Sequence, residues 1–471
     1  MLENFIYGMP WLILLLGIFS VPLFSYFSKS HTLPWHVTEF FVLASFFFEV
    51  VFYNKPINKQ FFAADYYTLL FSCVIYVCAL SLLLLARRWH SSMSTSGTLY
   101  CEGLLVGILS GNILIDATNF AFVPFLLCGL MLGNYLIFRH SDNKKGSSFG
   151  FVYALSCCVC GIILILCSVV LGLDNGSLQY TDIEQYLLTN NSSFAAYILV
   201  LLLVFCFVFI LGAAPLHFWY TETLGQTILP VMAYFTLFPP IVIFSVWNRF
   251  NMTMFMPFHT QVEIIYGAIA LLSMFGGALG ACSVVNIRKI ISYGSMYHFG
   301  MMILLMQNFK SGDIVNLTIY LLVFLLATYG IMVSLFGLKS KGEYLFMLND
   351  LSGAARKKPY VSAMITAYLF SLVGFPPFLG FIGLFNSVHN LVINNHPYML
   401  FMILGTTAVL VFAYLQIIRT LYFARGNNVY DRTERGIYAV MLFNALLMLS
   451  VSLKPEWLIA NIKFMTEGTL G

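Results

Sequence analysis

Six side chains that can hold or relay a proton lie in or beside strongly apolar segments of this chain. They are Glu49, Glu102, Asp116, His217, Tyr293 and His298. Histidine titrates near neutral pH, and an ionisable group inside an apolar segment is costly unless it has a function or a partner. Together these groups could line a water path through a membrane.

Each of these groups also has a structural interpretation. Glu102 and Asp116 could sit at helix ends that face water, His217 could anchor a helix end at the membrane surface, and His298 could be a hydrogen-bonded core histidine. Glu49 is harder to explain, because a lone carboxylate in a span is expected to be protonated, paired with a neighbouring subunit or functional.

The elements that position these groups are membrane-spanning helices. Of the 471 residues 60% are hydrophobic and 9% are charged, whereas soluble domains carry about a quarter charged residues. About fourteen apolar runs are long enough to cross a bilayer. They lie near residues 9–27, 37–53, 67–86, 101–115, 117–138, 150–172, 195–215, 228–247, 261–282, 290–307, 314–337, 360–390, 398–422 and 436–453. The sequence therefore predicts an all-α polytopic membrane protein without a soluble catalytic domain.

The twelfth of these runs contains an interruption. Ser371–Phe385 carries Pro376 and Pro377, followed by Gly380. Proline removes a backbone donor and clashes with the preceding turn, so we expect the helix to break there. Broken spans are typical of ion-moving proteins, although a simple proline kink between packed helices would also fit.

The distribution of basic residues predicts the orientation. Of the 23 lysines and arginines, sixteen follow odd-numbered runs, six lie on the opposite side and Arg419 lies within the thirteenth run. The positive-inside rule then places the odd-numbered loops, including Arg288 and Lys289, on the negative side of the membrane and both termini on the positive side. No lysine falls inside a predicted span, so a proton path through this chain would lack the buried lysines that readily serve as proton carriers.

The sequence also predicts what the chain does not bind. Ten cysteines are present, and Cys157, Cys158 and Cys160 cluster in one apolar run without a second cluster to complete a metal site. There is no nucleotide fingerprint, flavin motif or iron–sulfur spacing, and no feature that favours nucleic acid. We therefore expect no cofactor, no metal and no redox centre in this chain.

Three segments, taken together, resemble the antiporter-like subunits of complex I, the proton-pumping NADH:quinone oxidoreductase, and most closely the N-type subunit, chain 2. The first is Ala214–Trp219 with Glu222 three residues later. The second is Asn286–Gly300. The third combines Gly353–Pro359 with Ser371–Phe385. Subunits of cation/proton antiporters share much of this pattern and are the nearest alternative.

The resemblance implies two inverted five-helix repeats, with broken helices at spans 7 and 12. Gly212 and Pro215 could produce the break at span 7. The implied organisation is an N-terminal three-helix segment, a first repeat, a second repeat and a C-terminal helix with its tail. These correspond to residues 1–100, 101–248, 261–424 and 425–471.

The chain departs from the resemblance at the charged positions of the family's proton path. Where the family carries a glutamate and three lysines, this sequence has Gly129, Ile210, Pro240 and Leu384. Losing all four removes the ordinary means of holding a proton in the membrane. The resemblance therefore implies a subunit that keeps the fold but has a degenerate or inactive channel.

The resemblance also implies partners and location. We expect a hetero-oligomer with the other membrane-arm subunits of complex I, surrounded by membrane lipids, in the mitochondrial inner membrane with both termini in the intermembrane space. The alternatives are a subunit of a cation/proton antiporter and a membrane scaffold that does not pump.

Overall fold

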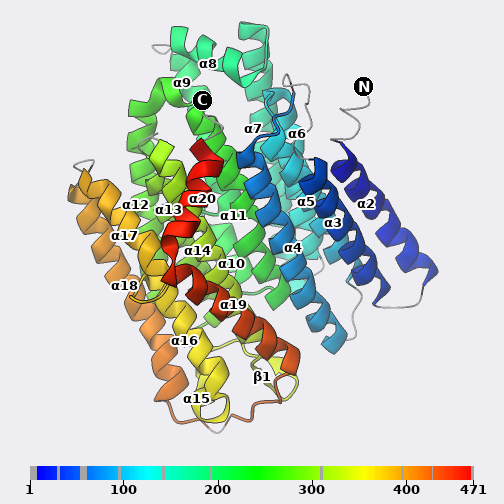
Figure 1. The fold of residues 1–471 in the computed structure, drawn as a ribbon, viewed down its shortest axis with the longest axis vertical. Coiled ribbons are helices and arrows are strands. Elements are labelled where there is room, and N and C mark those ends of the chain that lie inside the picture. Colours follow the sequence, from blue (N-terminus) through cyan, green and yellow to red (C-terminus); the bar gives the residue numbers. More distant parts are fainter. Residues whose placement is uncertain are drawn as a thin grey trace. The chain divides into compact units, whose positions relative to one another are not determined.

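A computed structural model describes residues 8–28, 32–52, 61–93, 97–139, 144–190, 194–307, 311–393, 397–426 and 428–467 (Figure 1). The chain divides into two compact units. Unit 1 comprises residues 1–211 and 238–262 with the last four residues, and unit 2 comprises residues 212–237 and 263–467. The long helix α11, Leu229–Met252, contributes its first part to unit 2 and its second part to unit 1.

The described residues of unit 1 form helices joined by short connections, two pairs of which meet in isolated β-bridges, Phe62 with Ala117 and Asn119 with Gln179. Its helices are α2 (Met9–Phe27), α3 (Leu33–Phe52), α4 (Tyr66–Met93), α5 (Thr98–Asp116), α6 (Val123–Arg139), α7 (Lys144–Asn175), α8 (Tyr180–Thr189), α9 (Phe194–Leu211) and the second part of α11, with short 3-10 turns at Phe120–Phe122 and Met256–Phe258.

Unit 2 contains the whole of the broken span formed by α16 and α17, and the second half, α10, of the span whose first half, α9, belongs to unit 1. Its elements are α10 (Phe218–Leu224), the first part of α11, most of α12 (His259–Ser283), α13 (Ile287–Leu305), α14 (Ser311–Phe336), β1 (Lys339–Ser340), β2 (Glu343–Tyr344), a 3-10 turn (Leu348–Leu351), α15 (Ala354–Lys357), α16 (Pro359–Val373), α17 (Gly380–Ile393), α18 (Pro397–Tyr422), α19 (Arg435–Leu453) and α20 (Pro455–Glu467). The strands form one antiparallel hairpin.

The predicted fold class is confirmed. Twelve helices of the described chain are long and apolar enough to cross a membrane. The remaining two predicted spans correspond to α13 and to the pair α16 and α17. Pro239 and Pro240 lie inside α11, which continues through them.

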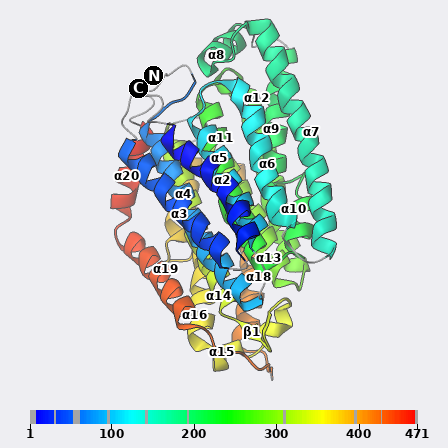
Figure 2. The ribbon, with the colours of Figure 1, turned by 90° about the vertical axis from the view of Figure 1, so that its right-hand side faces the viewer.

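Four α-helices of the described chain lie outside the predicted spans: the very short α10 and α15, and the longer α8 and α20. In unit 1, α8 crosses between the end of α7 and the start of α9 and buries Tyr180, Ile183 and Leu187 (Figure 2). In unit 2, α20 follows α19 and buries Ile462 and Thr466. Both are too short and too polar on one side to give a membrane-span signal.

Helices α5 and α6 of unit 1 pack backbone to backbone. A Cβ atom placed on Gly103 would come within 2.7 Å of the Gly133 carbonyl oxygen, and one on Gly133 would come as close to the Gly103 carbonyl oxygen. Small residues allow this approach between membrane helices.

The two helix breaks have the same length and the same turn residue. Helix α9 ends at Leu211 and α10 begins at Phe218, whereas α16 ends at Val373 and α17 begins at Gly380. A glycine with positive φ opens each interruption, at 71° for Gly212 and 80° for Gly374. Only glycine adopts this conformation without steric cost, so both predicted breaks are confirmed and both start in the same way.

Candidate functional site

The break between α16 and α17 borders a small cavity in unit 2. Its walls come from α13, α14, α16, α17 and α18, and the space open to the centre of a water molecule is about 10 Å³, enough for roughly one water. The polar residues on its walls are Tyr297, His298, Tyr320, Ser371 and Thr407. The cavity is therefore a polar pocket inside an otherwise apolar helix bundle.

His298 is the central titratable group of this cavity. Its side chain is buried, and Nδ1 lies 2.9 Å from the Tyr320 hydroxyl on α14. The other ring nitrogen, Nε2, is buried without a hydrogen-bond partner among the described residues. A buried polar atom nearly always has a hydrogen-bond partner, either a protein group or an ordered water. The predicted proton-path residue thus lies where one water could reach it.

Two further contacts fix the wall of the cavity. The Tyr297 hydroxyl lies 2.6 Å from the Thr407 hydroxyl on α18. Across the break, the backbone N–H of Gly380 donates to Ser371 Oγ at 3.2 Å. A Cβ atom on Gly380 would lie 1.5 Å from the Ser371 carbonyl oxygen, so only glycine fits there. The two half-helices are therefore held in direct contact by Ser371 and Gly380.

Leu384 lies on the wall of the same cavity. It occupies the position to which the resemblance assigns a lysine, and its Cβ also contacts the turn at Gly374. An apolar side chain therefore stands beside the cavity at this position. Tyr293, in contrast, is half-buried and packs against Gly277 and Gly280 of α12, and it does not line this cavity.

The first break of unit 2 is attached to the start of α13. The Glu222 carboxylate and Lys289 Nζ are 2.5 Å apart. Asn286 donates to the Gly225 carbonyl at 2.9 Å, and Arg288 Nη1 donates to the Thr227 carbonyl at 2.5 Å. Asn286 also caps α13 through its side chain.

These contacts correct the interpretation of Arg288 and Lys289 as ordinary loop cations. Both belong to the first turn of α13, and Arg288 is only 7% exposed, with its guanidinium 4.7 Å from the centre of the Phe346 ring. His217, which precedes α10, is partly buried, and its carbonyl accepts hydrogen bonds from the backbone N–H groups of Tyr220 and Thr221.

In unit 1, the three predicted carboxylates have different surroundings. Glu102 is half-buried and lies just after the first turn of α5. Asp116 is the last residue of α5 and is fully buried, so the interpretation that it opens the following span and faces water is wrong. Glu49 lies in the last turn of α3 and is 8% exposed.

The remaining family positions also carry no ionisable group. Gly129 on α6 lies against Ser110 of α5, with 3.2 Å from a Cβ placed on Gly129 to that of Ser110. Ile210 is buried near the end of α9, and Pro240 is buried within α11.

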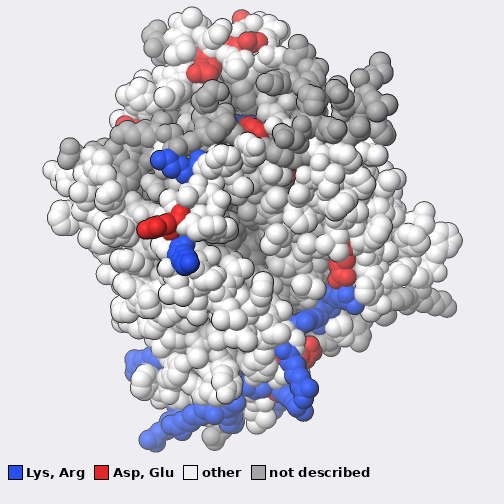
Figure 3. All heavy atoms as spheres, in the orientation of Figure 1, with Lys and Arg blue, Asp and Glu red and all other residues white. Residues whose placement is uncertain are grey.

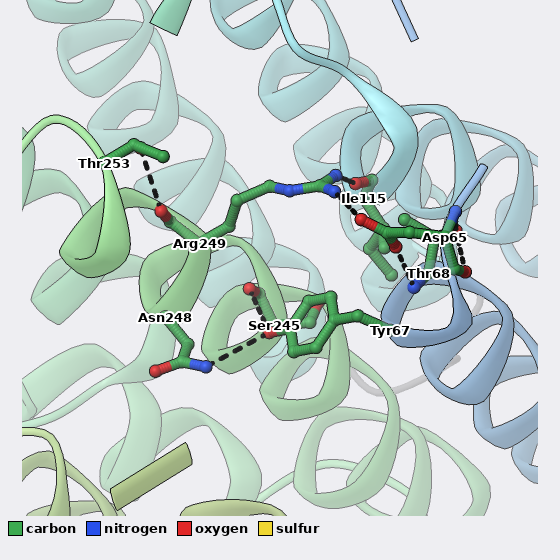
Figure 4. A network of polar contacts seen from close by, with 8 residues as sticks. All are labelled: Asp65, Tyr67, Thr68, Ile115, Ser245, Asn248, Arg249 and Thr253. Carbon is green, nitrogen blue, oxygen red and sulfur yellow. Dashed lines mark hydrogen bonds and ion pairs between the residues drawn. The ribbon is translucent and has the colours of Figure 1, made fainter. Parts of the chain in front are cut away.

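A polar network in unit 1 was not predicted from the sequence. Arg249, near the end of α11, forms an ion pair with Asp65 at 2.6 Å and donates a second hydrogen bond to the Ile115 carbonyl (Figure 4). The Tyr67 hydroxyl donates to the Ser245 carbonyl at 2.7 Å. Asp65 and Arg249 are 184 positions apart in the chain, so only the fold reveals the pair.

Comparison with known proteins identifies the family. A family model described as NADH:quinone oxidoreductase/Mrp antiporter, transmembrane, matches residues 120–411. The chain belongs to this family. The match covers both breaks and the His298 cavity.

Relatives with curated names are similar over most of their length. NADH-quinone oxidoreductase subunit N of Pelagibacter ubique is 27% identical over 364 residues, which cover 76% of each chain. The same subunit of Beijerinckia indica is 26% identical over 355 residues, covering 75% of this chain and 74% of the relative.

Two solved structures have the same fold. A chain of respiratory complex I from Thermus thermophilus superimposes with a TM-score of 0.81 at 19% identity, covering 96% of this chain and 98% of that one. A chain of the Mrp complex from Dietzia gives a TM-score of 0.84 at 14% identity, covering 100% and 98%. These likenesses show the antiporter-like fold.

Proposed function

We propose that this chain is the N-type, antiporter-like membrane-arm subunit of a complex I, chain 2, in which other subunits pass electrons from NADH to ubiquinone. The observation that carries this proposal is the family match over both broken spans, together with relatives that are named NADH-quinone oxidoreductase subunit N. The chain would contribute to a hetero-oligomer of membrane subunits and lipids and would itself bind no cofactor.

The channel of this subunit is degenerate in our proposal. Glycine, isoleucine, proline and leucine occupy the four family positions, and Leu384 stands on the wall of the cavity that contains His298. Neither leucine nor the neighbouring hydroxyls can hold a stable positive charge. His298 and one water could still exchange a proton locally, but the relay would have no cationic partner at Leu384.

We place the chain in the mitochondrial inner membrane, with both termini in the intermembrane space. Its high hydrophobicity and 46 phenylalanines are compatible with synthesis inside an organelle. Exposed cations gather at one end of unit 2, around β1, α15 and the connection from α18 to α19 (Figure 3). They are Lys341, Arg356, Lys357, Arg425, Arg432 and Arg435. Under the positive-inside rule this end faces the matrix.

A subunit of a cation/proton antiporter is the second candidate. It is favoured by the structural likeness to the Mrp complex, which extends over the whole chain. It is disfavoured by the four apolar or small residues at the charged positions, since ion coupling requires membrane-embedded lysines or carboxylates.

Two measurements test the proposal. Affinity purification of a tagged chain from mild detergent should yield a large assembly with NADH:quinone reductase activity, and recovery with antiporter subunits alone would contradict the assignment. Proton translocation per electron pair in the purified complex should be lower than in complexes whose N-type subunit carries the lysines. An equal stoichiometry would exclude a degenerate channel.

A further inference from the structure

Five polar residues form a buried cluster in unit 1, and none of them is one of the four family channel positions. Three helices supply them: α3, α4 and α5. They are Ser45, Glu49, Tyr76, Asn112 and Asp116, and none is more than 8% exposed.

The helix periodicity places these residues around Tyr76. Ser45 and Glu49 are four residues apart on α3, and Asn112 and Asp116 are four residues apart on α5, so each pair shares one helix face. Tyr76 lies on α4, which connects them. The Asn112 amide lies beside the Tyr76 hydroxyl, and the carboxyl groups of Glu49 and Asp116 both lie close enough to act on it electrostatically.

The hydrogen bonds of this cluster show which hydroxyl group donates and which accepts. Ser45 Oγ donates its only proton to the Pro10 carbonyl at 3.0 Å. Ser45 and Tyr76 are 2.6 Å apart, so the Tyr76 hydroxyl must donate to Ser45. The lone pairs of the tyrosine oxygen then remain to accept a hydrogen bond from Asn112 or from a protonated carboxyl.

Glu49 lacks a compensating charge within the described residues. Among the described residues of unit 1, the ion pairs join Arg87 and His36 to Glu39 and Arg249 to Asp65, and no hydrogen bond or ion pair joins the Glu49 carboxyl to another described side chain. An unpaired carboxylate buried among apolar helices costs several kcal/mol, and binding a proton removes that cost.

We propose that Glu49 and Asp116, linked through Tyr76, Ser45 and Asn112, form a proton-binding site in the N-terminal helices of this chain. Both carboxyl groups lie in the last turns of α3 and α5. Because consecutive spans cross in alternate directions, these two helices end on the same side of the membrane. The Asp116 carbonyl accepts a hydrogen bond at 2.7 Å from Ala63 in the loop before α4. The site exchanges protons with that side of the membrane, because both helices end there.

Chemical modification tests this site directly. Dicyclohexylcarbodiimide reacts with protonated carboxyl groups in apolar surroundings and leaves a stable acylurea. Treatment of native membranes near neutral pH should modify Glu49, as detected by mass spectrometry, and Glu49→Gln should abolish the adduct. The matched control is Glu39 on the same helix, which is paired with Arg87 at 3.1 Å and should remain unmodified.

A second variant tests whether the two carboxyl groups share the site. Asp116→Asn removes a neighbouring negative charge, so Glu49 should release its proton more readily. The pH above which Glu49 is no longer modified should therefore be lower in this variant than in the unmodified chain. The titratable groups beside Glu49 are Cys73 and Tyr76 of α4, and Tyr76 also lies near Asp116 of α5. An unmodified Glu49, or a pH profile unaffected by Asp116→Asn, would overturn the proposal. Neither result depends on whether the chain assembles into complex I.

Discussion

His298 Nδ1 on α13 and the Tyr320 hydroxyl on α14 are 2.9 Å apart, and both residues line the cavity at the break of span 12. This pair occupies the site where a proton path would need a titratable group. Leu384 faces the same space, so the pair is polar but has no cationic neighbour on the cavity wall.

Replacing Tyr320 with phenylalanine should leave His298 buried with both ring nitrogens lacking a protein partner. We expect this to destabilise unit 2 by about 1–3 kcal/mol. The thermal stability of the purified assembly would measure the effect. A double-mutant cycle with His298→Ala should show strong coupling, and additive losses would indicate that the pair contributes nothing to stability. Tyr297→Phe is the matched control, since it removes a hydroxyl that contacts Thr407 instead.

Gly380→Ala should prevent the two half-helices of span 12 from meeting. The added methyl group would overlap the Ser371 carbonyl, and relieving such overpacking costs about 1–3 kcal/mol or more. The amount of assembled protein in membranes should fall sharply. Gly405→Ala on α18 provides the control, because a Cβ atom there meets nothing within 4 Å. Equal accumulation of both variants would show that the protein assembles even when α16 and α17 are pushed apart at the break.

Leu384→Ala should have little effect on proton pumping. Leucine cannot hold a proton, so shortening it removes packing alone, at a cost of about 1–3 kcal/mol. The measurement is protons translocated per electron pair in the purified complex, compared with the unmodified chain. A substantial change in this ratio, at equal assembly, would mean that Leu384 shapes a working path and that the channel is not degenerate.

Arg249→Gln should destabilise unit 1 far more than Lys289→Gln destabilises unit 2. Arg249 is 14% exposed and its partner Asp65 is 25% exposed, and the substitution leaves the Ile115 carbonyl and a partly buried carboxylate without their donor. We expect a loss of about 2–4 kcal/mol.

Lys289 is the matched comparison because its partner Glu222 is 45% exposed. Exposed ion pairs contribute about 0–1 kcal/mol. Thermal unfolding of the two variants, with Asp65→Asn as a further test of the first pair, should reproduce this ranking. Similar losses of stability for Arg249→Gln and Lys289→Gln would contradict the argument that the more buried ion pair contributes more.

The helical spans and the break at span 12 were predictable from local sequence, whereas the break at span 7 was implied by the resemblance. A run of about 20 apolar residues has few alternatives to a membrane helix, and proline next to glycine interrupts the backbone hydrogen bonds whatever surrounds it. The resemblance then indicated the family and implied that Leu384 stands where the family has a lysine. Helices α8 and α20 escaped prediction because a short amphipathic segment has no comparable signal.

The contacts between polar groups required the tertiary structure. Asp65 and Arg249 are distant in the chain, and nothing in either segment identifies the other as its partner. Arg288 and Lys289 resembled loop cations, yet one is buried against Phe346 and the other pairs with Glu222. Asp116 resembled a water-facing helix end, yet it is fully buried.

The sequence by itself determined that this chain crosses the membrane many times and that Gly129, Ile210, Pro240 and Leu384 carry no charge, because hydropathy and residue identity are local properties. Only the tertiary structure decided which polar groups meet: His298 with Tyr320, and Ser45 with Tyr76. These side-chain contacts depend on which helices pack side by side. The apolar pattern that predicts each helix does not specify which helices become its neighbours.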